Sequence, residues 1–108
     1  MEKIDKEELL RYIDECFDKI SDKNDILEII AMDDNNDPIK STIRDRQLNL
    51  DYTGLFGSLL MKARRAVRLI DANDQLVEVR VRTKKHETFI TPDIYVTFIT
   101  VQNPIDKI

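Results

Sequence analysis

Two residues of this chain could serve as a metal ligand or a nucleophile: its single histidine, His86, and its single cysteine, Cys16. A metal site needs several ligands close together, and His86 stands in a basic turn without a second His or Cys nearby. Cys16 falls on the apolar side of an expected helix, where a thiol packs as a small hydrophobe. We therefore read both residues as structural.

Neighbouring carboxylates such as Glu7 and Glu8 could in principle act as an acid and a base. Nothing around them predicts the buried setting that separates those two roles. A loop that cradles phosphate needs glycines, but the only two glycines, Gly54 and Gly57, lie inside an expected helix. We expect no enzyme, no bound metal and no cofactor.

The composition, with 42% apolar and 35% charged residues in 108, indicates one globular domain over residues 1–108. A net charge of -4 argues against general affinity for nucleic acid. Acidic residues crowd the first forty positions, whereas positions 62–85 are basic. That basic middle could grip nucleic acid, but it lacks interleaved aromatic residues, so pairing with another subunit or a protein partner is favoured.

Cysteine use and hydropathy indicate where the protein works. A small domain with one cysteine suits a reducing compartment, because it can form no intrachain disulfide. The charged start of the chain does not resemble a secretory signal, and no window has the roughly 20 apolar residues that a membrane span requires. We expect a cytosolic protein that does not enter a membrane.

Periodicity and turn residues predict the elements in the order helix, two strands, helix, three strands. Asp5 and Glu8 resemble a capping pair at the start of the first helix. The expected helices are Lys6 to Ile20 and Leu50 to Ile70, and the expected strands are Ile26 to Met32, Pro38 to Arg44, Leu76 to Thr83, Glu87 to Thr91 and Tyr95 to Gln102.

These elements predict an α/β fold in which a five-stranded antiparallel sheet is sandwiched by the two helices on opposite faces. The run Ile26 to Met32, apolar except for Glu28, is typical of a strand in the sheet interior. The strand Leu76 to Thr83 alternates apolar and charged residues, which favours the sheet margin. On the long helix, we expect one apolar arc to face the sheet: Tyr52, Leu55, Phe56, Leu59, Ala63, Ala66, Val67 and Ile70.

The two glycines point to a contact outside the subunit. Each should cost about 1 kcal/mol inside a helix, so some contact must compensate. We place Gly54 and Gly57 on the back of the long helix with Met61, Arg64 and Arg68, where a second copy of the helix could approach closely. The alternative is that the glycines relieve crowding against the first helix or a loop of the same subunit.

The marginal strand supports self-association, because an exposed sheet edge invites pairing with the same edge of another copy. We therefore add Val77 and Val79 to the expected dimer contact. The alternative is an edge that Arg80 and Arg82 protect from pairing.

Several segments taken together resemble the roadblock family of dynein light chains. They are Pro38-Ile39-Lys40-Ser41-Thr42, Lys62-Ala63-Arg64, Val67-Arg68, Ile70-Asp71, Asn73-Asp74, Val79-Arg80-Val81-Arg82, Lys84-Lys85-His86-Glu87, Pro92-Asp93 and Val101-Gln102-Asn103-Pro104. The similarity covers roughly Ile26 to Pro104. The family's usual glycine in the first hairpin is replaced by Asn36, which also enters the left-handed region.

The resemblance implies a roadblock-like fold that dimerises through the long helix and the neighbouring strand into a continuous sheet. It also implies a non-catalytic light chain that binds a dynein intermediate chain, as a homodimer or with a paralogous light chain. Such a protein would be associated with the cytoskeleton in cytoplasmic dynein or the ciliary axoneme. The alternative is a scaffold or regulator of a small GTPase, a role that other roadblock-fold proteins have.

Overall fold

The computed structural model describes residues 3–23 and 25–104. The expected order of elements is confirmed, while residues 1–2, 24 and 105–108 of the expected single domain lie outside the described residues. The elements are α1 (Lys6–Ser21), β1 (Ile26–Met32), β2 (Pro38–Ser41), α2 (Arg46–Ile70), β3 (Val79–Arg82), β4 (Glu87–Pro92) and β5 (Thr97–Gln102).

Both helices begin at an aspartate whose side chain caps the exposed backbone N–H groups of the first turn. The backbone N–H of Glu8 donates to Asp5 Oδ1 at 2.8 Å, so the expected cap of α1 is confirmed. Asp45 plays the same part for α2, accepting from the N–H of Leu48 at 3.0 Å. The helix therefore begins at Arg46, earlier than the expected start at Leu50.

Three strands are shorter than expected, namely β2, β3 and β5. β2 ends at Ser41, whose hydroxyl accepts from the N–H of Ile43 and turns the chain toward α2. β3 pairs with β4 only from Val79, since continuing the same register would bring the chain opposite Pro92, which has no N–H to donate. β5 begins at Thr97, which is paired with both Met32 and Pro92.

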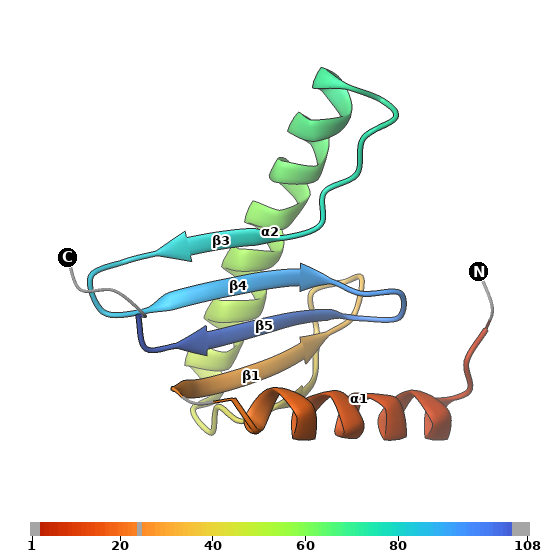
Figure 1. Ribbon diagram of the computed structural model, residues 1–108. Coiled ribbons are helices and arrows are strands. Elements are labelled where there is room, and N and C mark those ends of the chain that lie inside the picture. Colours follow the sequence, from red (N-terminus) through yellow and green to blue (C-terminus); the bar gives the residue numbers. More distant parts are fainter. Residues whose placement is uncertain (1–2, 24, 105–108) are drawn as a thin grey trace.

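The strands form one antiparallel sheet in the order β2-β1-β5-β4-β3, which leaves β3 at an edge as expected. Figure 1 shows α1 along the β1 side of the sheet and α2 behind it, crossing the strands steeply. The two helices thus take opposite faces, and the prediction of a sheet sandwiched by helices is confirmed.

The alternation of side chains along each strand divides the core into two apolar clusters. Ile30 faces α2 and packs with Leu60, Ile90 and Ile99. Its neighbour Ile29 faces α1, where a second cluster contains Ile13, Phe17, Ala31, Val96 and Phe98. The run Ile26–Met32 is apolar except for Glu28, and its last four residues are buried because both faces of β1 are covered there, as we expected for an interior strand.

The turn between β1 and β2 is closed by polar side chains. Asp33 Oδ1 accepts from the N–H groups of Asn35 and Asp37 at 2.9 and 3.0 Å. Asn36 has φ 63°, so the expectation that this residue enters the left-handed region is confirmed. This conformation aims the Asn36 side chain at α2, where it lies against Gly57.

Polar and aromatic contacts fasten α1 to the sheet at its outer rim. The Tyr12 hydroxyl donates to Asp93 Oδ2 at 2.8 Å, and the Tyr12 ring meets the Tyr95 ring edge-on at 5.3 Å between centroids. Burial, followed by the hydrogen bond to Asp93, raises the pKa of Tyr12. The phenol is therefore held in its neutral, donating form and links α1 to the β4–β5 turn.

Tyr12→Phe is expected to lower the free energy of unfolding by about 1 kcal/mol at neutral pH, the net value of one hydrogen bond. Because the folded-state pKa of Tyr12 is raised, its contribution is complete below about pH 10, the ordinary tyrosine value, and declines as pH rises further. In urea denaturation, the difference between wild type and variant should stay level up to about pH 9 and shrink above about pH 10. Tyr95→Phe, which keeps the neighbouring ring, is the control. If the difference in free energy of unfolding between wild type and Tyr12→Phe grows above pH 10, the hydrogen bond assigned to Tyr12 is contradicted.

Candidate interaction surface

The C-terminal half of α2 projects beyond the sheet. Figure 1 shows the helix crossing behind β3 and continuing past that edge. Leu60 is buried in the same cluster as the half-buried Val79 and Val81 of β3, so this part of the helix lies at the level of the edge strand. After Leu60 no residue of α2 is buried, and only Ala63 and Val67 are half-buried. About ten residues of helix therefore lack a covering layer within the described chain.

One side of α2 is both apolar and exposed, and we call it the leucine face: Leu48, Leu55, Leu59, Ala66, Leu69 and Ile70. Leu55 is 71% exposed and Ile70 is 86% exposed. Leu55, Leu59, Ala66 and Ile70 belong to the arc that we expected to face the sheet, so that expectation was wrong for these positions. The residues of α2 that are buried in the sheet are Thr53, Gly57 and Leu60, supported by Tyr52 and Phe56.

A second exposed side of α2, the arginine face, holds Gly54, Met61, Arg64 and Arg68. A methyl group added to Gly54 would meet nothing within 4 Å, and Met61 is 61% exposed. Arg64 and Arg68 border a concavity of about 310 Å³ whose other wall is the α2–β3 connection, residues 72–76. This side is therefore partly flanked by the subunit's own chain.

Gly57 does not lie on the outward face where we placed it. It is buried against the β1–β2 turn, and a Cβ at this position would overlap the side chain of Asn36, with the amide nitrogen only 2.7 Å away. Gly57 is present because a loop of the same subunit approaches the helix there. The alternative reading of the glycines is therefore the correct one for Gly57, whereas Gly54 remains open to an outside partner.

The edge strand β3 offers a second kind of contact. Its outer side has no neighbouring strand among the described residues, so its outward N–H and C=O groups are available for pairing. Val77, just before the strand, is 76% exposed, while Val79 points into the core beneath α2. The predicted dimer residues thus divide into an exposed group (Gly54, Met61, Arg64, Arg68 and Val77) and an inward pair (Gly57 and Val79).

The charges of β3 are occupied within the sheet. The Arg80 guanidinium lies 3.6 Å from a carboxylate oxygen of the buried Glu87 and 4.8 Å from the centre of the Phe89 ring. In contrast, the structure shows no ion pair for Lys62, Arg64, Arg65 or Arg68 on α2, counting only partners in residues 3–23 and 25–104. The projecting helix therefore presents uncompensated positive charge beside apolar side chains.

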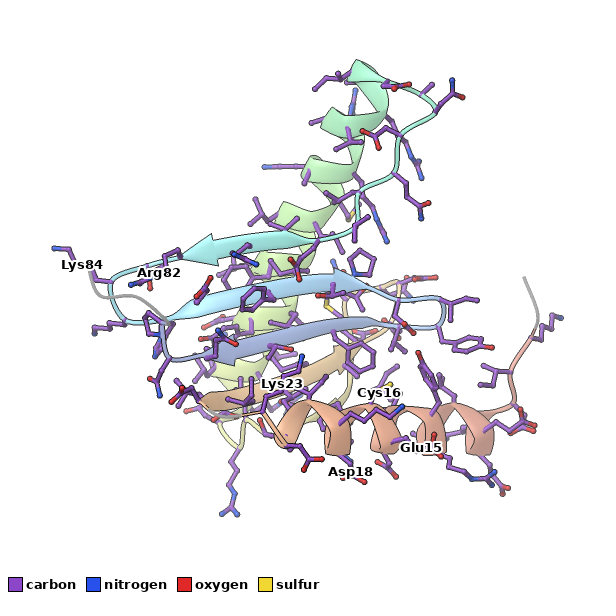
Figure 2. All side chains as sticks on the ribbon, viewed as in Figure 1. Glu15, Cys16, Asp18, Lys23, Arg82 and Lys84 are labelled. Carbon is purple, nitrogen blue, oxygen red and sulfur yellow. The ribbon has the colours of Figure 1, made fainter. Side chains whose placement is uncertain are left out.

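The residues considered for chemistry lie apart from this surface. Figure 2 shows Cys16 on the sheet side of α1 and Asp18 on the opposite side of that helix. Cys16 is half-buried beside the cluster of Ile13 and Phe17. The N–H of His86 donates to the Thr83 hydroxyl in the β3–β4 turn. Within the described residues, no group of three His, Cys, Asp or Glu is placed to hold a metal ion.

The chain is a small α/β domain with a partly uncovered helix and an open sheet edge. Its family model is the Roadblock/LC7 domain, which matches residues 12–103, and the chain belongs to this family. The Roadblock/LC7 domain of Streptomyces avermitilis has a similar structure, with a TM-score of 0.67 at 10% sequence identity. This match covers 73% of the present chain and 67% of the bacterial one. The roadblock-like fold expected from the resemblance is confirmed.

Among the described residues, no helix combines the length and the apolar character needed to cross a bilayer.

The two glycines of α2 provide matched variants that test their placement. Gly54→Ala should raise the free energy of unfolding by about 1 kcal/mol, because alanine favours a helix and the site is open. Gly57→Ala should lower it by about 1 kcal/mol or more, because Asn36 must be displaced. In an Asn36→Gly background, which removes the obstructing side chain and tolerates positive φ, Gly57→Ala should no longer destabilise. Equal effects of the two alanines in urea denaturation would refute this packing.

Proposed function

We propose that this protein is a non-catalytic light chain that dimerises through α2 and the β3 edge and, as a dimer, binds a segment of a dynein intermediate chain. The observation that carries the dimer is the leucine face, an exposed apolar strip along a helix that projects past the sheet. Exposed apolar strips of this kind are typical of surfaces that another protein covers. Burying one leucine side chain contributes about 1.5–3 kcal/mol, so a few of them would support a stable contact.

The leucine face suits this contact better than the arginine face. Pairing two copies of the arginine face would bury the charges of Arg64 and Arg68 in the contact, and the members of this face include no carboxylate to pair with them. The α2–β3 connection also flanks that face. The leucine face does not border that concavity, and it continues along the projecting half of the helix.

The edge strand completes the proposed dimer. When two copies pair their β3 strands, the unpaired edges disappear and a continuous sheet forms. The projecting half of each α2 then has a second sheet to cross, because the partner's strands begin where its own end. One two-fold axis would therefore cover both the exposed helix and the exposed edge.

Four of the carboxylates in the described chain have structural tasks, which favours a non-catalytic role. Glu87 is buried against Arg80. Asp33 closes the β1–β2 turn, and Asp5 and Asp45 cap the helices. A protein built in this way contributes area and orientation to an assembly. Its dimer would offer two equivalent binding sites. A partner that carries two binding segments would then bind more tightly, because the first contact raises the effective concentration of the second segment.

The dynein assignment rests on the resemblance of the segments around Lys84-Lys85-His86-Glu87 and Gln102-Asn103-Pro104 to the light chains. It places the protein with cytoplasmic dynein or the axoneme, on the cytoskeleton. In this role the chain could also pair with a paralogous light chain. A second candidate is a roadblock scaffold that regulates a small GTPase, which is consistent with the occurrence of the fold in a Streptomyces protein.

Two exposed positions on α2, Leu55 and Met61, test which face makes the dimer. Leu55→Glu should give monomers at micromolar concentration, because it buries a charge in the contact. Met61→Glu introduces the same group on the arginine face and should leave the dimer in place. Light scattering after size exclusion measures the outcome. Monomers from Met61→Glu alone would restore the arginine face as the contact, and dimers from both variants would exclude α2.

Affinity purification from ciliated cells tests the partner, with tagged wild type as bait and the Leu55→Glu variant as the matched control. We expect wild type to recover dynein intermediate chain and the monomeric variant to recover at least about tenfold less, because the variant loses the paired sites. Quantitative mass spectrometry provides the measurement. Recovery of a small GTPase without any dynein subunit would overturn the dynein assignment and favour the scaffold.

A further inference from the structure

The leucine face has a flank that points away from the sheet, and this flank carries a negative charge at one end and a positive charge at the other. Positions 48, 52, 55, 59, 62, 66 and 69 of α2 alternate steps of four and three, the spacing of a coiled-coil seam. Asp51, Ser58 and Arg65 stand seven residues apart and therefore line one side of this seam. The flank thus has a negative end, a small neutral centre and a positive end.

This pattern distinguishes the two directions in which a pair of α2 helices can run. In an antiparallel pair that crosses at Ser58, each Asp51 lies at the level of Arg65 in the other copy, because both are equally far from the crossing point. In a parallel pair, Asp51 would lie level with Asp51 and Arg65 level with Arg65, so that neither charge meets its opposite. The flank is therefore complementary to itself only when the helices are antiparallel.

The position of the crossing point agrees with the sheet. Leu60 packs in the cluster that contains Val79 and Val81, so Ser58 and its neighbours lie at the level of the β3 edge. A two-fold axis that joins two β3 edges would run just outside this strand, close to the middle of the leucine face. The charge pattern and the open edge therefore call for the same axis, although they belong to different elements.

Both charged side chains are placed to take part. Asp51 and Arg65 are exposed, and the structure shows no ion pair for either among the described residues. Asp51 Oδ1 accepts a hydrogen bond from Gln47 Nε2 at 2.8 Å, which holds the carboxylate on the flank and leaves its other oxygen available. At the opposite end, Arg65 borders a shallow concavity with Met61 and Leu69.

We propose that Asp51 of one subunit pairs with Arg65 of the other, and that these two symmetry-related ion pairs fix the antiparallel register of the dimer and select its partner. This proposal rests on the proposed dimer through the leucine face, but it makes a separate claim about direction. The contact area comes from the apolar side chains, since an exposed ion pair adds little affinity. The charges instead repel a chain that presents a like charge at the same level, as the flanking charges of coiled coils do.

Charge exchange tests the register with full-length chains. Asp51→Arg and Arg65→Asp should each weaken self-association by roughly tenfold, because each homodimer then holds two like-charge contacts. An equimolar mixture of the two variants should form a heterodimer at wild-type strength, since every contact in it is again between opposite charges. One chain that carries both substitutions should also form its own homodimer again. Native mass spectrometry counts the three dimer species in the mixture.

Matched controls separate the register from a general effect of charge. Glu15→Arg on α1 and Arg68→Asp on the arginine face change the net charge equally and should leave the dimer unaffected. If neither Asp51→Arg nor Arg65→Asp weakens a dimer that Leu55→Glu abolishes, the register is refuted and the proposed dimer stands. The register is refuted as well if both variants weaken self-association but their mixture does not recover it. A monomeric wild type would instead refute the proposed dimer itself.

Discussion

A mismatch of length between α2 and the sheet underlies the rest of this structure. A helix of 25 residues is about 37 Å long, whereas five strands at their usual spacing span only about 20 Å from the first to the last. Because α2 crosses the strands steeply, its second half has no sheet beneath it (Figure 1). The apolar residues on that half, such as Leu69 and Ile70, can be covered only by something outside the described chain.

The sheet can carry such a helix because its interior strands contribute buried side chains to both faces within the subunit. Neighbouring residues on β1 serve different layers, Ile29 under α1 and Ile30 under α2. The first helix is further held to the sheet by the hydrogen bond from the Tyr12 hydroxyl to Asp93. Lys40 of β2 also contacts this helix, because it forms an ion pair with Asp14 and lies over the Phe17 ring. The α1 layer covers the β1 side of its face and leaves a concavity of about 360 Å³ beside Phe89 and Phe98, whereas the overhanging half of α2 leaves a strip of exposed apolar side chains.

Much of the fold was predictable because its signals are local. The aspartate before the first helix, a nearly unbroken apolar run and turn residues such as Asn36 identified the order of elements and the layers. The face of α2 was less predictable, since periodicity shows that residues share a side but not what covers that side. Leu55 and Leu59 have the spacing of core residues, and only the orientation of α2 on the sheet shows that they lie on the exposed side of the helix. The exposed dimer candidates Met61 and Arg68 were correctly placed at the surface, but their contact remains a prediction.

The case of Gly57 shows why local signals fail at a close approach. The sequence shows two glycines three residues apart on one helix, and helix geometry alone suggests a shared purpose. The purpose of Gly57 is instead determined by Asn36, which reaches the helix because its backbone adopts φ 63° in a turn distant along the chain. The loop therefore carries a side chain opposite a position where the helix has none. The Gly57 and Asn36 positions therefore constrain each other within one subunit, and any partner of α2 must use the surface that remains.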